Sequence, residues 1–321
     1  MTWKENWVFP ALDPRNRVAS LFHFSLRPSE GEGIFTAKFC VDGEEFRYVG
    51  RSPIPAELQT MEAVENERVR FEVLEPGKRF GLSYSGPELD ASLVYDARFA
   101  PFDFADGPLA PGESELGDIG RTVFPFHHYE QALTHEGTLV LKHGPRAGET
   151  IHLSGFANRD HSWGWRSEFT FTHHHWLCAS FDDRFVEGSV CEDRHYPHGP
   201  KRGGWISTAA GNDPVAEVDT SDGYPLEPGM PLSSVFKDVR YRVRTLGGKE
   251  ATVIAHLADD YGRLYLDLRH PDRSKTYQDV QMFCDVTLVE TGQTGTGVLE
   301  VGAIGIGKGV ADAWRRTASR A

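Results

Sequence analysis

Residues 155–168 carry the densest set of chemically active side chains in the sequence. The run GFANRDHSWGWRSE holds four charged residues, one histidine and two tryptophans within fourteen positions. A strand that only fills a core has little use for so many ionisable groups, whereas general acid–base catalysis needs carboxyl and imidazole groups beside an apolar surface. This segment is therefore the first candidate for an active site.

The faces of a strand divide this segment into two sets. On a regular strand, one face would carry Arg159, His161, Trp163 and Trp165, and the other Asp160, Ser162, Arg166 and Glu168. Asp160 and His161 then cannot line one barrel interior, so we expect Asp160 at the interface between two domains, with Arg166 as its charge partner. A neighbouring arginine lowers the pKa of a carboxyl, which suits a base or an orienting group. The competing interpretations are an ion pair that only ties the domains together and a histidine bonded to a backbone carbonyl.

Glu130, next to Tyr129, is the second candidate acid. A glutamate desolvated between two aromatic-rich domains has a raised pKa, as the protonation of a weakly basic carbon atom demands. Tyr129 could donate or accept a proton beside it. A surface carboxylate and a buried tyrosine with one hydrogen-bond partner are the alternatives. We predict Asp160, His161, Glu130 and Tyr129 as the catalytic residues.

Five further residues are predicted to bind the substrate, and they are Trp163, Trp165, Arg166, His173 and His175. An indole face stabilises a developing cation and packs on a flat or polyene molecule, although both tryptophans are equally suited to a core. His173 and His175 share one strand face and would line a pocket mouth. A metal would need a third ligand, for which His195 or His198 is a source, and no H-E-x-x-H helix supports it. We predict no metal site.

The run Arg159-Asp160-His161-Ser162-Trp163-Gly164, followed one residue later by Arg166, resembles a known signature. It is similar to the motif that opens the second domain of two-domain, lipocalin-like proteins, a superfamily with carotenoid 1,2-hydratases (hydroxyneurosporene synthases) and AttH-like proteins. Residues 127–131 resemble the segment before that motif in an uncharacterised bacterial branch. The resemblance implies an all-β fold and acid–base or shape-based catalysis on bulky apolar substrates without a redox cofactor.

The elements that must position these groups have the pattern of strands. Alternation of apolar and charged side chains, typical of half-buried strands, occurs in residues 68–74, 89–98, 240–244 and 263–269. Asp42-Gly43 is typical of a tight hairpin turn. Because helical periodicity is scarce, βαβ crossovers are excluded. We predict an all-β protein of two lipocalin-like (calycin-like) antiparallel domains, residues 1–154 and 155–321, with a short C-terminal helix over 308–318.

The composition excludes several kinds of partner. The 34 Lys and Arg against 47 Asp and Glu give a net charge of −13, which repels phosphate backbones, so no nucleic acid is expected. No run of roughly 18 apolar residues and no apolar leader occurs, so we predict a cytoplasmic protein without membrane insertion. The four cysteines lack C-x-x-C spacing and are expected to be reduced and mostly buried. A homodimer is left open.

Together these features favour a cofactor-independent acid–base lyase or isomerase of the hydratase, dehydratase or carbon–carbon lyase type. Its substrate would be a bulky apolar or aromatic small molecule, such as an isoprenoid, sterol-like or phenylpropanoid compound, bound at the domain interface. The first alternative is a non-catalytic lipocalin-like carrier of an apolar ligand. The second is a metal-dependent enzyme that uses the histidine cluster.

Overall fold

The described part of the chain consists of strands and two short 3₁₀ turns. The computed structural model describes residues 2–54, 63–107, 127–166, 171–193, 201–220, 238–257, 261–269 and 276–304. The turns are η1 (Pro28–Glu30) and η2 (Phe104–Asp106). The predicted helix over 308–318 lies outside these residues. In the described ranges, no helix has the length and hydropathy that a membrane span requires.

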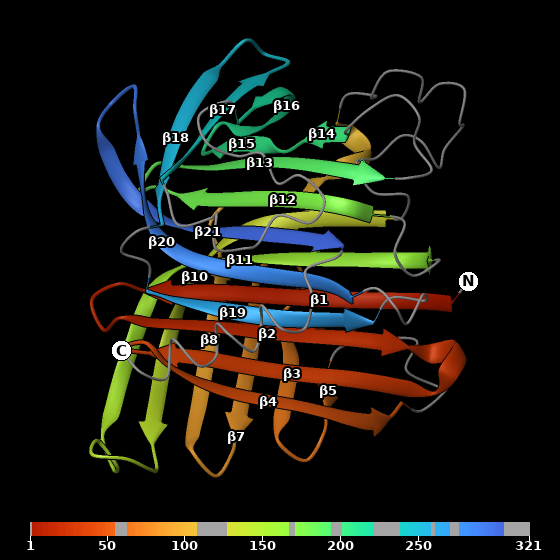
Figure 1. Cartoon of the computed structure of the whole chain (residues 1–321), viewed down its shortest axis with the longest axis vertical. Coiled ribbons are helices and arrows are strands. Elements are labelled where there is room, and N and C mark those ends of the chain that lie inside the picture. Colours follow the sequence, from red (N-terminus) through yellow and green to blue (C-terminus); the bar gives the residue numbers. More distant parts are fainter. Residues whose placement is uncertain are drawn as a thin grey trace.

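The strands form two large antiparallel sheets (Figure 1). The first sheet contains β1 (Thr2–Asp13), β2 (Val18–Arg27), β3 (Glu32–Val41), β4 (Glu44–Pro53), β5 (Ala63–Glu65), β6 (Val69–Glu75), β7 (Arg79–Ser85), β8 (Leu89–Ala97), β9 (Phe102–Asp103), β10 (His127–Leu141) and β11 (Thr150–Arg166). Its order is β4-β3-β2-β1-β11-β10-β8-β7-β6-β5, with β9 paired to β10. The long strands β10 and β11 therefore lie at its centre.

The second sheet closes on itself. It contains β12 (Phe171–Ser180), β13 (Arg184–Asp193), β14 (Lys201–Gly203), β15 (Trp205–Thr208), β16 (Gly211–Asp219), β17 (Val239–Thr245), β18 (Glu250–His256), β19 (Gly262–Arg269), β20 (Thr276–Leu288) and β21 (Gln293–Ile304). The path β12-β21-β20-β18-β17-β16-β15-β13 returns to β12, because β12 also pairs with β13. Closure removes the exposed strand edges of an open sheet. The predicted all-β, lipocalin-like fold is confirmed.

Alternation along the strands fills the inside of each sheet with apolar side chains. In β17, Val239, Tyr241 and Val243 are buried and the arginines between them are exposed, as the sequence pattern predicts. The first interior is rich in aromatic rings, including Phe9, Phe22 and Phe71, and the second in aliphatic side chains. All four cysteines are free and buried, as predicted.

The hairpin predicted at Asp42-Gly43 joins β3 to β4. Both residues have positive φ, 50° for Asp42 and 84° for Gly43, and Val41 pairs with Glu44 across the turn. Positive φ at both central positions is the type I′ geometry, whose twist matches that of the strands it connects. The turn therefore sets the register of this hairpin.

The two sheets pack against each other through the outer faces of their central strands. One interface cluster joins Phe102, Phe104 and Ala132 of the first sheet to Trp176, Cys178, Phe185, Cys191 and Trp205 of the second. A second cluster joins residues of β1, β2 and β3 to β20, β21, Tyr261 and Leu264. Near the second cluster, β19 lies against β2 and β3 (Figure 1). The interface is thus a third apolar layer between two filled interiors.

The chain passes from one sheet to the other between Arg166 and Phe171. The predicted boundary after residue 154 falls inside β11, whose whole length pairs within the first sheet. Two domains stay a prediction, and we propose that their division lies at this change of sheet. The motif of residues 159–166 then forms the end of β11, the last strand of the first sheet.

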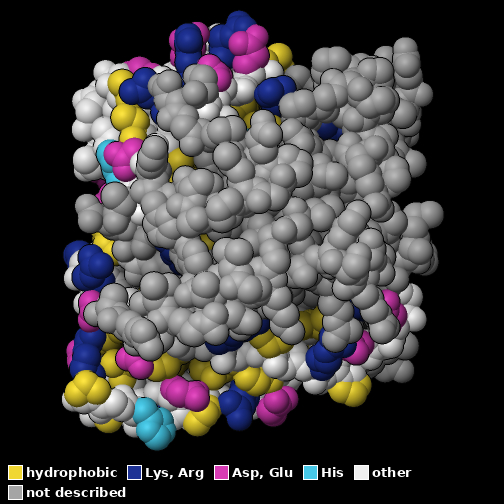
Figure 2. All heavy atoms as spheres, in the orientation of Figure 1, with side chains coloured by type: hydrophobic (Ala, Val, Ile, Leu, Met, Phe, Trp, Pro, Cys, Tyr) yellow, Lys and Arg dark blue, Asp and Glu magenta, His cyan; other side chains and the backbone are white. Residues whose placement is uncertain are grey.

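Charged side chains of both signs mix on the described surface (Figure 2). Basic side chains at the surface pair with nearby carboxylates, as in Arg146 with Glu149 at 2.7 Å and Lys142 with Asp90 at 2.6 Å. Exposed pairs of this kind contribute little to stability. Positive and negative side chains therefore lie next to each other in these parts of the surface.

Gly155 is a position where the sheet leaves no room for a side chain. A Cβ atom there would lie 2.1 Å from the backbone oxygen of Leu12 in β1. We expect Gly155→Ala to lower the free energy of unfolding by about 2 kcal/mol or more, because backbone must shift to relieve the contact. Gly81→Ala in β7 is the matched control, since its Cβ would meet Leu74 at an ordinary 3.6 Å. Urea unfolding of both variants checks this, and equal midpoints would contradict it.

Candidate functional site

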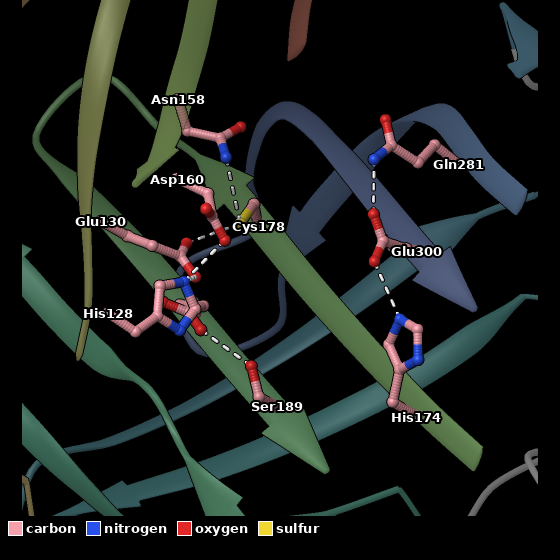
Figure 3. Close-up of polar contacts among 10 residues, drawn as sticks. His128, Glu130, Asn158, Asp160, His174, Cys178, Ser189, Gln281 and Glu300 are labelled. Carbon is pink, nitrogen blue, oxygen red and sulfur yellow. Dashed lines mark hydrogen bonds and ion pairs between the residues drawn. The ribbon is translucent and has the colours of Figure 1, made fainter. Parts of the chain in front are cut away.

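Three polar side chains of the first sheet converge on its interface face. Glu130 of β10 and Asp160 of β11 are direct cross-strand partners, and His128 lies two residues before Glu130 on the same face. His128 Nε2 is 2.6 Å from Asp160 Oδ2 and 3.2 Å from Glu130 Oε1 (Figure 3). Glu130 is 1 % exposed, whereas the Asp160 side chain is 19 % exposed. One imidazole nitrogen therefore touches a buried and a partly solvated carboxyl.

The second sheet meets this group with a carboxyl of its own. Cys178 of β12 is the cross-strand partner of Glu187 in β13. The Sγ atom of Cys178 lies 4.0 Å from Glu130 Oε2 and accepts a hydrogen bond from Asn158 Nδ2 at 3.5 Å. Glu187 is fully buried, and Ser189 Oγ donates to its Oε1 at 2.8 Å. We call His128, Glu130, Asp160, Cys178 and Glu187 the carboxyl cluster.

Burial sets the protonation of this cluster. Desolvation raises the pKa of Glu130 well above its usual value, and the nearby carboxyls of Glu187, Asp160 and Glu300 raise it further. Desolvation likewise raises the pKa of Glu187, partly opposed by Ser189 and Trp176. It also raises the pKa of Cys178. Burial therefore favours the protonated carboxyls of Glu130 and Glu187 and the neutral thiol of Cys178.

Aromatic rings cover one side of the carboxyl cluster. Phe104 stacks on the His128 imidazole, with centroids 4.5 Å apart and planes at 14°. Phe102 stacks on Trp205 at 4.6 Å, and Trp205 meets Phe104 edge-on at 5.6 Å. We call Phe102, Phe104 and Trp205 the aromatic wall. It shields one side of the cluster from bulk solvent and presents ring faces beside the carboxyls.

Tyr129 and His161 face the opposite way, into the first sheet's interior. His161 Nδ1 lies 2.8 Å from Tyr129 Oη, and its Nε2 lies 2.9 Å from Glu5 Oε1. The imidazole stacks on Trp7 at 3.6 Å, and its burial lowers its pKa. The four predicted catalytic residues are thus split into two pairs on opposite faces, because neighbouring strand residues alternate.

The predicted substrate-binding residues do not gather at the carboxyl cluster. Trp163 shares the face of His161 and stacks on His127 at 5.1 Å. His175 lies in the second interior, with Nδ1 2.6 Å from Tyr241 Oη. The side chains of Trp165, Arg166 and His173, together with His195 and His198, lie outside what the structure describes. The described ion pair of Asp160 is with His128.

A second polar group lies beside the carboxyl cluster on β12, β20 and β21. His174 Nε2 is 2.8 Å from Glu300 Oε1, and Gln281 Nε2 donates to Glu300 Oε2 (Figure 3). Asp279 is buried, and desolvation followed by Glu300 raises its pKa, whereas Lys38 of β3 lowers it. Lys38 is itself fully buried. Lys38 of the first sheet and Asp279 of the second therefore interact electrostatically across the interface.

Two sets of side chains have donor types that a divalent cation accepts. They are His128, Glu130 and Asp160, and His174, Asp279 and Glu300, with donor atoms within 4.8 Å of one another in each set. Burial raises the pKa of Glu130 in the first set and of Asp279 in the second, which favours protonated carboxyls over cation-binding carboxylates. The metal-ligand set considered from the sequence used His173 and His175. It differs from both of these sets, because His174 and His175 point to opposite faces of β12. The absence of a metal site stays a prediction.

Sequence reasoning missed Glu187, Trp176 and Phe104 as parts of the site. Glu187 is the one charged residue in the run Phe185–Cys191 of β13, and it alternates in step with Phe185 and Cys191. A lone carboxyl in such a strand signals forced burial. Trp176 shares a face of β12 with His174, and alternation along the strand does not show that this face meets the other sheet. Phe104 lies in a Pro- and Gly-rich connection without periodicity.

Comparison with known proteins supports the fold. A family model described as a domain of unknown function, DUF7064, matches residues 1–303. A solved structure described as an AttH from Nitrosomonas europaea is 15 % identical, with a TM-score of 0.59, and the match covers 94 % of this chain and 92 % of that one. Kievitone hydratase from Nectria haematococca is 12 % identical, with a TM-score of 0.58, covering 94 % and 88 %. No curated protein matches.

These likenesses extend over nearly the whole chain. At 15 % and 12 % identity they concern the fold, and at the level of the fold they confirm the resemblance to AttH-like proteins. The match over residues 1–303 of 321 establishes membership at the level of sequence. The chain therefore belongs to the family described as the domain of unknown function DUF7064.

Proposed function

We propose that the protein is a hydratase-like enzyme that adds water to, or removes it from, a carbon–carbon double bond. The substrate would be a bulky apolar or aromatic small molecule bound between the two sheets, and no cofactor would be needed. The observation that carries this proposal is the buried carboxyl of Glu130 beside the His128–Asp160 pair, where desolvation raises the pKa of Glu130 well above its usual value.

Glu130 is the proposed proton donor. Alkene carbon is a very weak base, so its protonation requires a neutral carboxylic acid close to the double bond. The desolvated site keeps Glu130 in that form. Aromatic faces of Phe104 and Trp205 would stabilise the positive charge that develops on carbon.

Asp160 and His128 form the proposed base. The partly exposed Asp160 carboxylate orients the imidazole through the 2.6 Å contact with Nε2. Water that attacks the carbocation gives its proton to this pair. Because the same Nε2 is 3.2 Å from Glu130, the proton can return to Glu130 and restore the starting state. The cycle consumes one water and one double bond and leaves the protein unchanged.

The carrier alternative needs an apolar hollow and no ionisable groups. A hollow of about 790 Å³ in the structure is an open groove lined by polar residues such as Arg15, His152 and Ser154. A carrier has no use for buried acids beside a histidine. The name of the similar hydratase agrees with the enzymatic proposal.

Replacing Glu130 with glutamine should abolish proton donation while keeping size and hydrogen bonding. We expect turnover to fall about 100-fold or more. Purified protein would be incubated with isoprenoid, sterol-like and phenylpropanoid alkenes, and mass spectrometry would follow the gain or loss of one water. Glu136→Gln, on an exposed position of the same strand, is the matched control. Turnover by Glu130→Gln at the wild-type rate would contradict the role of Glu130 as proton donor. Release of an unchanged ligand without any turnover would favour a carrier.

The same substitution should change how stability depends on pH. A glutamate whose pKa rises on folding binds more protons in the native state, so stability falls as the pH rises from the unfolded toward the folded pKa. The slope for one proton is about 1.4 kcal/mol per pH unit. Urea unfolding between about pH 5 and pH 9 should show a shallower decline for Glu130→Gln than for the wild type. Parallel declines would mean that Glu130 ionises normally.

A further inference from the structure

Several buried polar atoms on the second sheet have no hydrogen-bond partner among the described residues, and two of them lie in one patch. One is the indole Nε1 of Trp176 in β12, and the other is Oε2 of Glu187 in β13. Trp176 is 7 % exposed and Glu187 is fully buried. Buried polar groups in proteins are nearly always hydrogen-bonded, to protein or to ordered water. Two such atoms in one patch therefore indicate a missing polar partner.

The strand register puts these atoms next to each other. Trp176 is the cross-strand partner of Ser189, and Cys178 is the partner of Glu187, so the four side chains share one patch on the interface face. Ser189 donates a 2.8 Å hydrogen bond to Oε1 of Glu187, which leaves Oε2 as the oxygen without a partner among the described residues.

Glu130 reaches the same patch from the first sheet. Its Oε2 lies 4.0 Å from Cys178 Sγ, directly over the β12–β13 pair (Figure 3). A hydrogen-bonding interaction with the Trp176 indole lowers the pKa of both Glu130 and Glu187. The indole N–H thus lies near two carboxyls, although Nε1 meets neither of them with full hydrogen-bond geometry. A polar gap of this kind is one that an oxygen atom commonly bridges.

We propose that Trp176 Nε1, Glu187 and Glu130 enclose an oxygen-binding position that holds a water molecule in the resting protein. A buried water needs two to four polar partners, and these three side chains supply them. The indole N–H donates to the oxygen, and the carboxyls exchange hydrogen bonds with it. Neither sheet contains the position alone, since Glu130 comes from the first and the other two from the second.

Resting on the proposed hydratase function, the same oxygen is the one added to the substrate. Glu130 gives its proton to one alkene carbon, and the oxygen forms a bond to the other. The oxygen then loses a proton to the His128–Asp160 pair, which returns it to Glu130. In the reverse direction the leaving hydroxyl occupies the position as it departs as water. Glu187 is the positioning residue for this oxygen.

Nuclear magnetic resonance of ¹⁵N-labelled protein tests the position without any substrate. The chain has seven tryptophans, and Trp176→Phe assigns the Trp176 indole signal by its loss. We expect a rotating-frame Overhauser cross-peak between this N–H and water. Glu187→Leu, which fills the gap with methyl groups, should remove the cross-peak and keep the indole signal. Trp7→Phe, a matched change in the first interior, should leave both unchanged.

An indole signal without a water cross-peak in the wild type would overturn the position, and so would a cross-peak that survives Glu187→Leu. Either result would leave the hydratase proposal standing. Unchanged turnover by Glu130→Gln would instead overturn the hydratase proposal and leave the bound water in place. With a substrate in hand, Trp176→Phe should lower kcat about 10-fold or more with little change in KM.

Discussion

The burial of carboxyl groups between two sheets is the constraint on which the rest of the site depends. Moving an ionised carboxylate into an apolar interior costs more than a folded protein can tolerate, so such a group keeps its proton or gains a partner. Glu130 and Glu187 come from different sheets and are both fully covered. Their protonated state is therefore a consequence of sheet packing, and anything that separates the sheets would return both to ordinary acids.

The alternation of strand side chains explains how one segment serves two purposes. On β10 and β11, odd-numbered residues such as Tyr129 and His161 complete the packing of the first interior around Trp7 and Glu5. Even-numbered residues such as Glu130 and Asp160 face the second sheet. Each interior is filled with its own side chains. Chemistry is then left to the layer between the sheets, where polar groups from both meet.

Sequence patterns predicted the fold class, the tight turn at Asp42-Gly43 and the opposed faces of Asp160 and His161. Glu130 is buried, as expected for a desolvated acid, but the cause of its raised pKa is the packing of the two sheets and not a local feature of the sequence. Sequence patterns could not find Glu187 or Trp176 as neighbours of Glu130, since that proximity depends on how two sheets pack and no spacing along the chain encodes it. His161 and Tyr129 were grouped with the acids by nearness in sequence, which on a strand places them on the other face.

The central claim is that Glu130 carries a proton at neutral pH within the folded protein. Infrared spectroscopy compares the wild type with Glu130→Gln under that condition. The account predicts that the wild type shows a carboxylic acid C=O stretch that the variant lacks, with no difference in the carboxylate bands. Loss of a carboxylate band in the variant, with no change in the acid region, would contradict it.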